Sequence, residues 1–204
     1  MGSGGARRAR RPAAFVDRDG VITEPVLDPR SETYESPLES GQTALAPGAA
    51  DGLRELQRLG FAVVVVSNQP AAAKGTVSLP DLAEVHHRAV ALLGGAGVEI
   101  DGWRYCFHHP DGVVAELRRA CECRKPRPGL ITAAAAALDI DLARSWVIGD
   151  ADTDVLAGQA AGCSTILVEH PRTAHRRLGA ALPDARARDL HAAAAALARV
   201  HAAL

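Results

Sequence analysis

The sequence has few aromatic residues, a single methionine and no excess of either charge. Phe, Trp and Tyr make up 3% of the 204 residues, so the hydrophobic core has to be built mainly from Val, Leu, Ile and Ala. Lys and Arg (23) almost balance Asp and Glu (24), which leaves a formal net charge of -1. Composition therefore argues against a basic surface for nucleic acid or an anionic membrane, and we expect neither as a partner.

Long hydrophobic runs are missing as well. The longest, Phe61 to Val66, is bounded by Gly60 and Ser67 and is too short to span a bilayer. The Arg-rich residues 1–12 lack the apolar segment that follows the charges of a secretory signal. We expect a flexible basic arm there, with a tail that grips nucleic acid as the alternative, and one domain over residues 13–204.

Short β-branched or aromatic runs alternate with helical patterns along the chain. The expected buried strands are Ala13 to Asp17, Phe61 to Ser67, Trp103 to Phe107, Trp146 to Ile148 and Thr165 to Val168. The expected helices are Ala49 to Leu59, Leu82 to Leu93, Gly129 to Leu138, Asp152 to Ala161 and His191 to Leu204. Helix starts are indicated by Pro47, Ser78, Asp152 and Asp189. The alternation predicts an α/β fold with a doubly wound parallel sheet covered on both faces.

Two segments interrupt this alternation. Thr23 to Ala46 is rich in Pro, Glu and Ser and follows the first strand, and His108 to Arg127 holds most of the cysteines. Loops that follow the carboxyl ends of parallel strands line the place where such sheets bind ligands. We therefore expect both segments to form walls of a substrate site.

Polar residues that can take part in catalysis or binding follow three of the expected strands, and a fourth group precedes a helix. They are Asp17 and Asp19, Ser67 and Asn68, Arg124 and Lys125, and Asp150, Asp152 and Asp154. Two carboxylates that leave a buried strand two residues apart repel each other and need a cation. A polar strand-to-loop turn is the alternative for Asp17 and Asp19 taken alone. The other three groups, expected at the same sheet edge, favour a site.

Three of the four cysteines and one histidine have the spacing of zinc ligands: Cys106, His108, Cys121 and Cys123. Three thiolates and an imidazole fill a tetrahedral site, so the ion would be structural and carry no reactive water. His109 could replace His108, and two disulfides or a chance clustering are the remaining alternatives. A zinc site fits a reducing cytoplasm, and we expect Cys163 to be an inert buried thiol.

Four short motifs occur in a fixed order along the chain: DRDG, SN, RKP and GDADTD. In these the chain resembles the haloacid dehalogenase superfamily of phosphatases, and the resemblance spans Ala13 to Val168. The segments FVDRDGVI, VVVVSNQ, YCFHHP and CECRKPRPGL resemble more closely the D-glycero-D-manno-heptose 1,7-bisphosphate 7-phosphatases and the related histidinol-phosphate phosphatases. The heptose bisphosphate phosphatases also carry the Cys-x-His and Cys-x-Cys arrangement, so the resemblance implies a structural Zn²⁺ too.

The resemblance implies a Mg²⁺-dependent hydrolase of phosphate monoesters, and the residue types suit that chemistry. Asp17 would be the nucleophile that becomes phosphorylated, and Asp19 the general acid and base. Mg²⁺ would be held by Asp17, Asp150 and the backbone carbonyl of Asp19. Lys125 and the Ser67 hydroxyl would stabilise the transferring phosphoryl group.

Supporting roles are expected for two further aspartates. Asp154 would orient Asp150 or Lys125, and Asp152 is a helix cap or a metal ligand.

The segments between the motifs are too short for a large cap domain, so specificity would come from the surrounding loops. We expect Arg124 to bind a second anionic group or a sugar hydroxyl, and Asn68 to contact the substrate. The 7-phosphate of heptose bisphosphate is the expected target, in carbohydrate metabolism, with histidinol phosphate or another small sugar phosphate as runner-up. A catalytically silent zinc-stabilised scaffold is the alternative of another class.

The substrate rim departs from the family at three positions. Pro70 and Lys74 replace the usual small residue and arginine, and Ala151 follows Asp150 where relatives often carry Lys or Ser. These changes leave the reacting groups in place but bear on the sugar that is accepted. His86 and His87 are expected to be an exposed pair without a catalytic role, and the chain to be a monomer.

Overall fold

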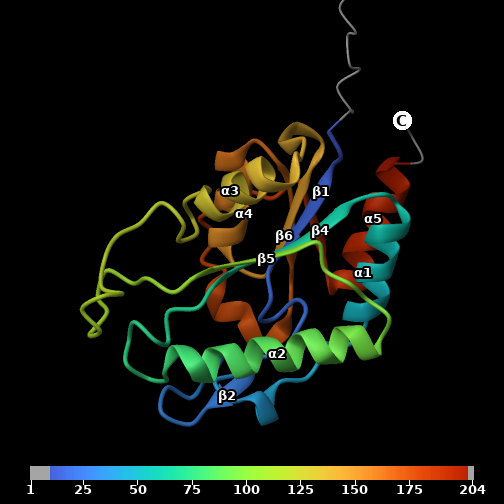
Figure 1. Cartoon of the computed structure of the whole chain (residues 1–204). Helices are drawn as coiled ribbons and strands as arrows, with labels where there is room; N and C mark the ends of the chain where they lie inside the picture. Colours follow the sequence, from blue (N-terminus) through green and yellow to red (C-terminus); the bar gives the residue numbers. More distant parts are fainter. Residues whose placement is uncertain (1–9, 202–204) are drawn as a thin grey trace, which may run out of the picture.

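A six-stranded parallel sheet forms the centre of the computed structural model, which describes residues 10–201 (Figure 1). Its strands, in spatial order, are β5 (Gly102–Cys106), β4 (Ala62–Asn68), β1 (Ala13–Val16), β6 (Trp146–Gly149), β7 (Ser164–Val168) and β8 (Ala185–Ala187). All neighbouring strands pair in parallel. The predicted parallel α/β sheet is confirmed, and five of its six strands are those expected from the sequence.

Helices cover both faces of the sheet (Figure 1). They are α1 (Ala49–Arg58), α2 (Leu79–Gly95), α3 (Gly129–Leu138), α4 (Asp152–Ala161) and α5 (Leu190–His201). One core cluster joins the sheet to α1 and α5, and a second joins its other face to α3 and α4. The central strands are consequently buried on both sides, which explains their almost uninterrupted Val and Ala composition.

Small residues let the α4 helix lie very close to the sheet. A Cβ atom added at Gly158 would come within 2.7 Å of Thr165 Cγ2 and 2.9 Å of Val147 Cβ. Such a contact is shorter than ordinary packing allows, so a larger residue would push the helix off the sheet. With few aromatic side chains to fill space, the protein gains its packing density from close approach of backbones.

The helix-start signals are largely confirmed. Ser78 caps α2 by accepting a hydrogen bond from Asp81 N, and Asp189 Oδ1 accepts one from Ala192 N at the start of α5. Asp152 behaves differently from both expectations, because α4 is preceded by Ala151 at the cap position. Its Oδ2 instead accepts hydrogen bonds from Leu178 N (2.7 Å) and Ala180 N (3.0 Å), so it holds a loop.

Two elements were not predicted. The segment after β1 contains a two-stranded antiparallel hairpin, β2 (Val26–Asp28) with β3 (Thr33–Glu35), and a 3-10 turn, η1 (Ser40–Gln42). Strand β8 consists of only Ala, Arg and Ala. Strands of three residues are too short to show a period, and the β8 residues have no β-branching, so pairing with neighbours decides their conformation.

Most of the expected basic arm, residues 1–12, lies outside the described residues. Its last residues, from Arg10 on, are attached to the sheet at the amino-terminal ends of the strands. Arg11 Nη2 lies 2.6 Å from Asp101 Oδ1, and the carbonyl of Pro12 accepts a hydrogen bond from Ala62 N. This backbone pairing places the chain in register for β1.

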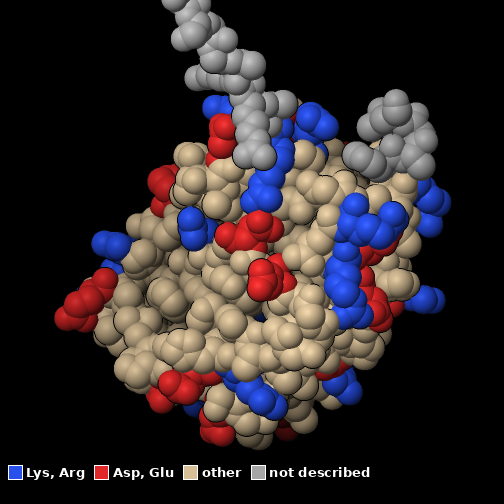
Figure 2. Space-filling view, turned by 45° about the vertical axis from the view of Figure 1, so that its right-hand side comes forward, with Lys and Arg blue, Asp and Glu red and all other residues tan. Residues whose placement is uncertain are grey.

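Charged side chains of both signs are mixed over the face in Figure 2, with uncharged surface between them. This distribution agrees with the balanced composition. Among residues 10–201, none of the helices has the length and apolar character needed to cross a bilayer.

Candidate active site and cysteine cluster

The carboxyl ends of β1, β4 and β6 meet at one edge of the sheet and open into a cleft. The expected site residues that line it are Asp17, Asp19, Ser67, Asn68, Arg124, Lys125, Asp150 and Asp154. Glu35 and Ser36 from the hairpin segment also line it, as expected for a wall formed by that part of the chain. Side chains separated by more than 130 residues in the chain therefore face the same space.

Lys125 lies at the floor of the cleft with its ammonium between two carboxylates. Its Nζ is 2.7 Å from Asp17 Oδ1 and 2.5 Å from Asp154 Oδ1, and it donates to the Val66 carbonyl at 2.7 Å. Burial by itself lowers the pKa of Lys125, but the charges of Asp154 and Asp17 more than offset this and raise it. The lysine is consequently a fixed cation beside Asp17.

Asp150 completes a group of three buried carboxylates. Oxygen atoms of Asp17, Asp150 and Asp154 lie within 4.8 Å of one another. Burial, only partly opposed by the charge of Arg176 and helped by the charges of Asp17 and Asp154, raises the pKa of Asp150 to about 7. Asp150 Oδ1 has no hydrogen-bond partner among the described residues. A buried oxygen without a partner, next to another carboxylate, fits a hard divalent cation such as Mg²⁺.

Gly20 makes the close approach of the first loop to β6 possible. It has a φ of +96°, and an added Cβ would lie 2.2 Å from Asp150 Oδ2. Any side chain there would displace the Asp150 carboxylate. The glycine of the DRDG motif therefore serves the geometry of the cleft as well as the turn.

The Asp19 carboxylate is held by four donors. Arg18 Nε and Nη2 donate to its two oxygens at 2.8 and 2.9 Å, Gln69 Nε2 donates at 2.6 Å and Thr23 Oγ1 at 2.8 Å. Burial raises the pKa of Asp19, but the charge and hydrogen bonds of Arg18 outweigh it and lower the value to about 2. In this arrangement Asp19 is a carboxylate at neutral pH and can accept a proton.

Asp154 occupies the supporting position expected for it. Besides its ion pair with Lys125, its Oδ2 accepts a hydrogen bond from Ala151 N at 3.1 Å, which fixes the carboxylate at the start of α4. It is 2% exposed. The contact with Lys125, rather than one with Asp150, is the one that the structure shows.

Asn68 clamps the segment that carries Lys125. Its Nδ2 donates to the Lys125 carbonyl at 3.0 Å and its Oδ1 accepts from Lys125 N at 3.1 Å. Both polar atoms of the amide are thus engaged with protein backbone. Ser67 Oγ lies nearby, 2% exposed as a residue and within 3.0 Å of the donor Gln69 Nε2.

Arg124 lies at the rim of the cleft, next to Lys125 in the chain. Its Nη1 donates a long hydrogen bond, 3.5 Å, to the backbone carbonyl of His108, and the residue is partly exposed. Lys74, from the loop after β4, lines the same cleft. Arg124 and Lys74 are therefore two cations that border the same cleft as the buried carboxylates.

Sequence reasoning missed two arginines of the site, Arg18 and Arg176. Arg18 is 1% exposed, and Arg176 follows β7 and contacts Asp150. The rule that loops after parallel strands line the site applies to the segment after β7 as well, and would have indicated Arg176.

The expectation of an exposed pair is wrong for His86 but right for His87. The His86 ring packs edge-on against Trp103, with ring centroids 4.8 Å apart, and its Nδ1 lies 3.0 Å from the Tyr105 hydroxyl. His87 is exposed. The buried residues Leu82, Val85 and Ala89 on the same helix indicate which neighbour faces inward.

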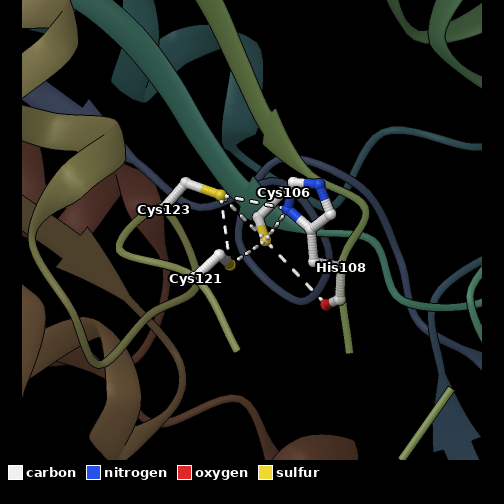
Figure 3. Close-up of side chains that lie close together, drawn as sticks. All are labelled: Cys106, His108, Cys121 and Cys123. Carbon is white, nitrogen blue, oxygen red and sulfur yellow. Dashed lines mark hydrogen bonds between the residues drawn. The ribbon is translucent and has the colours of Figure 1, made fainter. Parts of the chain in front are cut away.

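The four expected zinc ligands converge at the end of β5 (Figure 3). The sulfur atoms of Cys106, Cys121 and Cys123 are 3.3 to 3.6 Å apart, and His108 Nδ1 is 3.3 Å from Cys123 Sγ. Sulfur ligands at about 2.3 Å from a tetrahedral zinc lie roughly 3.7 Å from each other. Disulfides need about 2.05 Å, so the thiols are free. The donor set and spacing fit a four-coordinate zinc ion.

His109 and Cys163 do not belong to this group of four. His109 lies outside the group of four, and its Nδ1 accepts a hydrogen bond from Asp111 N at 3.1 Å. Cys163 is 7% exposed and packs in the core, where burial raises the pKa of its thiol to about 12. It is a buried thiol away from the cluster.

The chain matches known proteins in sequence. Residues 122–193 match the HAD-hydrolase-like family. The chain is 40% identical to a D-glycero-beta-D-manno-heptose-1,7-bisphosphate 7-phosphatase of Rhodopseudomonas palustris over 77% of this chain and 83% of the relative. It is 37% identical to the enzyme of that name from Escherichia coli K12, over 76% of each chain.

Solved structures give the same grouping. The crystal structure of D,D-heptose 1,7-bisphosphate phosphatase from B. bronchiseptica, complexed with magnesium and phosphate, superposes with a TM-score of 0.76 at 27% identity, over 92% of this chain and 99% of the other. A putative HAD-like phosphatase from Mesorhizobium loti has a TM-score of 0.71 at 32% identity, over 82% of this chain and 77% of the other.

Proposed function

The chain belongs to the haloacid dehalogenase superfamily and is a phosphatase, and on that basis we propose that it hydrolyses a sugar phosphate through a phosphorylated Asp17 with Mg²⁺. The substrate that we propose is D-glycero-D-manno-heptose 1,7-bisphosphate, with loss of the 7-phosphate. The names of the relatives at 37% and 40% identity support this substrate. The structure bound to magnesium and phosphate supports the choice of metal.

One observation carries the mechanism. Asp17 lies at the end of β1 with the Lys125 ammonium 2.7 Å from one of its oxygens and the unpartnered Asp150 oxygen in the same cleft. A carboxylate can attack a phosphate dianion only if their mutual repulsion is screened. Lys125 supplies one positive charge at the required place, and the Asp150 oxygen marks where a second can be held.

Asp17, Asp150 and the Asp19 carbonyl are the residues that would hold Mg²⁺. When bound, the ion would screen the phosphate charge and polarise the phosphoryl oxygens.

The first half-reaction transfers the phosphoryl group to the protein. An Asp17 oxygen forms a bond to phosphorus as the bond from phosphorus to the sugar oxygen breaks, which gives an aspartyl-phosphate and a sugar alkoxide. Lys125 and the Ser67 hydroxyl stabilise the negative charge on the equatorial oxygens. Asp19 donates a proton to the departing alkoxide.

The second half-reaction releases phosphate. Asp19 takes a proton from a water molecule, the water oxygen bonds to phosphorus, and the bond to Asp17 breaks. With a pKa of about 2, Asp19 carries no proton at neutral pH, which is the protonation state of the basic role although it makes a weak base, whereas the preceding acidic role needs a proton on the carboxyl. Contact with Arg18 disfavours that proton.

The rim supports a substrate with a second anionic group. Arg124 and Lys74 both line the cleft beside the buried carboxylates. A planar guanidinium binds phosphate oxygens in pairs, and an ammonium adds a point charge. Asn68 contributes by holding Lys125 in place rather than by a free amide. These contacts suit a bisphosphate better than a phosphate ester with a cationic remainder.

The cysteine cluster would hold a structural zinc ion. Its four donors leave no position for a reactive water, and Cys123 precedes Arg124 and Lys125 directly in the chain. We therefore assign the ion the task of stiffening the loop that delivers these two cations. One domain over residues 13–204, a monomeric state and a cytoplasmic location complete the proposal.

Phosphate release tests this function. Purified protein with Mg²⁺ should hydrolyse heptose 1,7-bisphosphate with a kcat/KM at least about tenfold above those for fructose 1,6-bisphosphate and histidinol phosphate, a discrimination of about 1.4 kcal/mol. Comparable efficiency on all three would contradict the substrate. A protein that releases phosphate from no monoester, including an aryl phosphate, would be the silent zinc-stabilised scaffold instead.

A further inference from the structure

Arg176 joins three segments of the molecule that come from different parts of the chain. It is the last residue of η3 (Pro171–Arg176), the 3-10 segment that follows β7, and its side chain is 17% exposed. Its guanidinium reaches the loop after β1, the end of β6 and the β2–β3 hairpin. An arginine held by three segments has few conformations left to it.

One nitrogen of Arg176 contacts two of the groups proposed to hold Mg²⁺. Nη1 donates to the Asp19 carbonyl at 2.9 Å and to Asp150 Oδ2 at 3.2 Å. Asp150 Oδ1 has no hydrogen-bond partner within residues 10–201. Arg176 therefore donates to one oxygen of the Asp150 carboxylate, and no donor among the described residues contacts the other.

The other nitrogen anchors the arginine to the hairpin. Nη2 donates to the Tyr34 carbonyl at 3.4 Å and lies 3.8 Å from Glu35 Oε2. These contacts use a different nitrogen from the one that donates to Asp150. They hold Nη1 against the Asp19 carbonyl and Asp150 when the side chain could otherwise turn toward solvent.

We propose that Arg176 is a positioning residue for the metal site: it holds the Asp19 carbonyl and Asp150 Oδ2 so that Asp150 Oδ1 faces the ion. This inference rests on the proposed function, because it concerns the same Mg²⁺. Groups that hydrogen-bond to a metal ligand fix its orientation, and their loss typically weakens metal affinity 10- to 100-fold. Mg²⁺ is sensitive to such changes because it demands near-octahedral geometry.

If only the charge of Arg176 mattered, its loss would have the opposite effect on Mg²⁺ affinity. A guanidinium close to a divalent cation repels it, so removal of that positive charge should strengthen metal binding if orientation were unimportant. The sign of the change in affinity therefore distinguishes a positioning residue from a competing cation.

The experiment measures Mg²⁺ affinity by isothermal titration calorimetry on the full-length, zinc-loaded protein without substrate. We expect Arg176→Gln to raise the dissociation constant about tenfold or more. Arg176→Lys keeps the charge but cannot contact three segments with a planar fork, so it should weaken binding by a smaller factor. Unchanged or tighter binding by Arg176→Gln would overturn the proposal.

Arg172→Gln is the matched control. Arg172 belongs to the same η3 segment, is half exposed and pairs with Glu24 at 2.9 Å, away from the metal oxygens. It removes the same charge, and its affinity should equal that of the parent protein. A loss of affinity as large as that of Arg176→Gln would mean that the loss does not depend on the contacts with the Asp19 carbonyl and Asp150, and would contradict the proposal.

Folding and the underlying function are checked separately. Thermal unfolding and zinc content establish that each variant is folded, and if Arg176→Gln does not fold, unchanged affinity in Arg176→Lys still contradicts the proposal. A parent protein that binds Mg²⁺ with the same affinity as Arg176→Gln disproves only the role of Arg176. A parent protein that binds no Mg²⁺ disproves the metal dependence of the proposed function as well.

Discussion

The cleft and the cysteine cluster are two candidate sites for cations, and they differ in almost every physical property. The cleft offers buried carboxylate oxygens, with Lys125 and Arg176 as neighbours that balance part of their charge. The cluster offers three thiols and an imidazole, whose four ligand atoms lie within 4.8 Å of one another. Hard oxygens with an open side suit Mg²⁺ and a reaction, whereas four soft donors suit zinc and stability.

The two sites are nevertheless joined by one short stretch of chain. Cys123 belongs to the cluster, Arg124 borders the cleft and Lys125 lies on its floor. The difference between the two sites suggests how a loop without regular structure can place a cation in a cleft: in the function proposed above, a metal ion bound by the cluster would hold the end of the loop that carries Lys125. Variants that impair one site and leave the other unchanged test whether the two sites have these separate roles.

The largest effect is expected from Asp17→Asn. The amide cannot act as the nucleophile, so phosphate release should fall to the background level, measured with an aryl phosphate and with the bisphosphate. Zinc content should stay at about one ion per chain, because the cluster has four ligands of its own. Asp139→Asn, an exposed exchange of the same type, is the control. Residual turnover within a hundredfold of the parent would contradict the role of Asp17.

Asp19→Asn comes next. Loss of a positioned general acid and base typically lowers the rate by about 10² to 10⁴. We expect kcat to fall in that range, with retention of Mg²⁺ binding, because the backbone carbonyl of Asp19 is still present. A steady-state assay together with metal titration checks both parts. A kcat within tenfold of the parent would exclude Asp19 from proton transfer.

Cys121→Ser should affect the other site. Loss of a thiolate ligand should remove zinc, which elemental analysis detects, and we expect a loss of about 3 kcal/mol in the free energy of unfolding, or roughly 6–12 °C in Tm. Cys163→Ala is the control, since this buried thiol lies outside the cluster and should leave zinc in place. Full zinc retention by Cys121→Ser would remove the assignment.

The smallest effect is expected from a change at Arg124, which lies in the chain between Cys123 of the cluster and Lys125 of the cleft. Arg124→Ala should raise KM for the bisphosphate about tenfold, which corresponds to the loss of one charged hydrogen bond, and should leave turnover of an aryl phosphate nearly unchanged. Arg127→Ala changes an exposed arginine of the same loop, paired with Glu122, and should behave as the parent. Equal losses on both substrates would place Arg124 in the chemical step or the fold.

Much of the fold was predictable because its signals are local. Buried parallel strands such as β4 appear as continuous runs of Val, and α2 begins at a Ser78 cap, as the sequence indicated. The hairpin β2–β3 and the edge strand β8 were not predictable, because three residues show no period and their pairing depends on a neighbour that the local sequence does not contain.

The candidate site was predictable in its members but not in its contacts. The order of polar residues at strand ends indicated Asp17, Lys125 and Asp150, and the structure brings them into one cleft. The interpretation of Asp152 as cap or ligand was wrong, because its carboxylate accepts hydrogen bonds from the backbone of the 178–180 loop. No local pattern contains that information, since the donors lie 26 and 28 residues away.

By itself, the sequence determined the order of strands and helices and the residue types that reach the carboxyl edge of the sheet, since periodicity, caps and metal-ligand spacing act over a few positions. Only the tertiary structure decided that Asp19 is held by Arg18 and Gln69, and that Arg176 contacts the Asp19 carbonyl from 157 residues away. The physical reason is that charge balance and pKa in a buried site depend on which groups come within a few ångströms, and packing sets those distances.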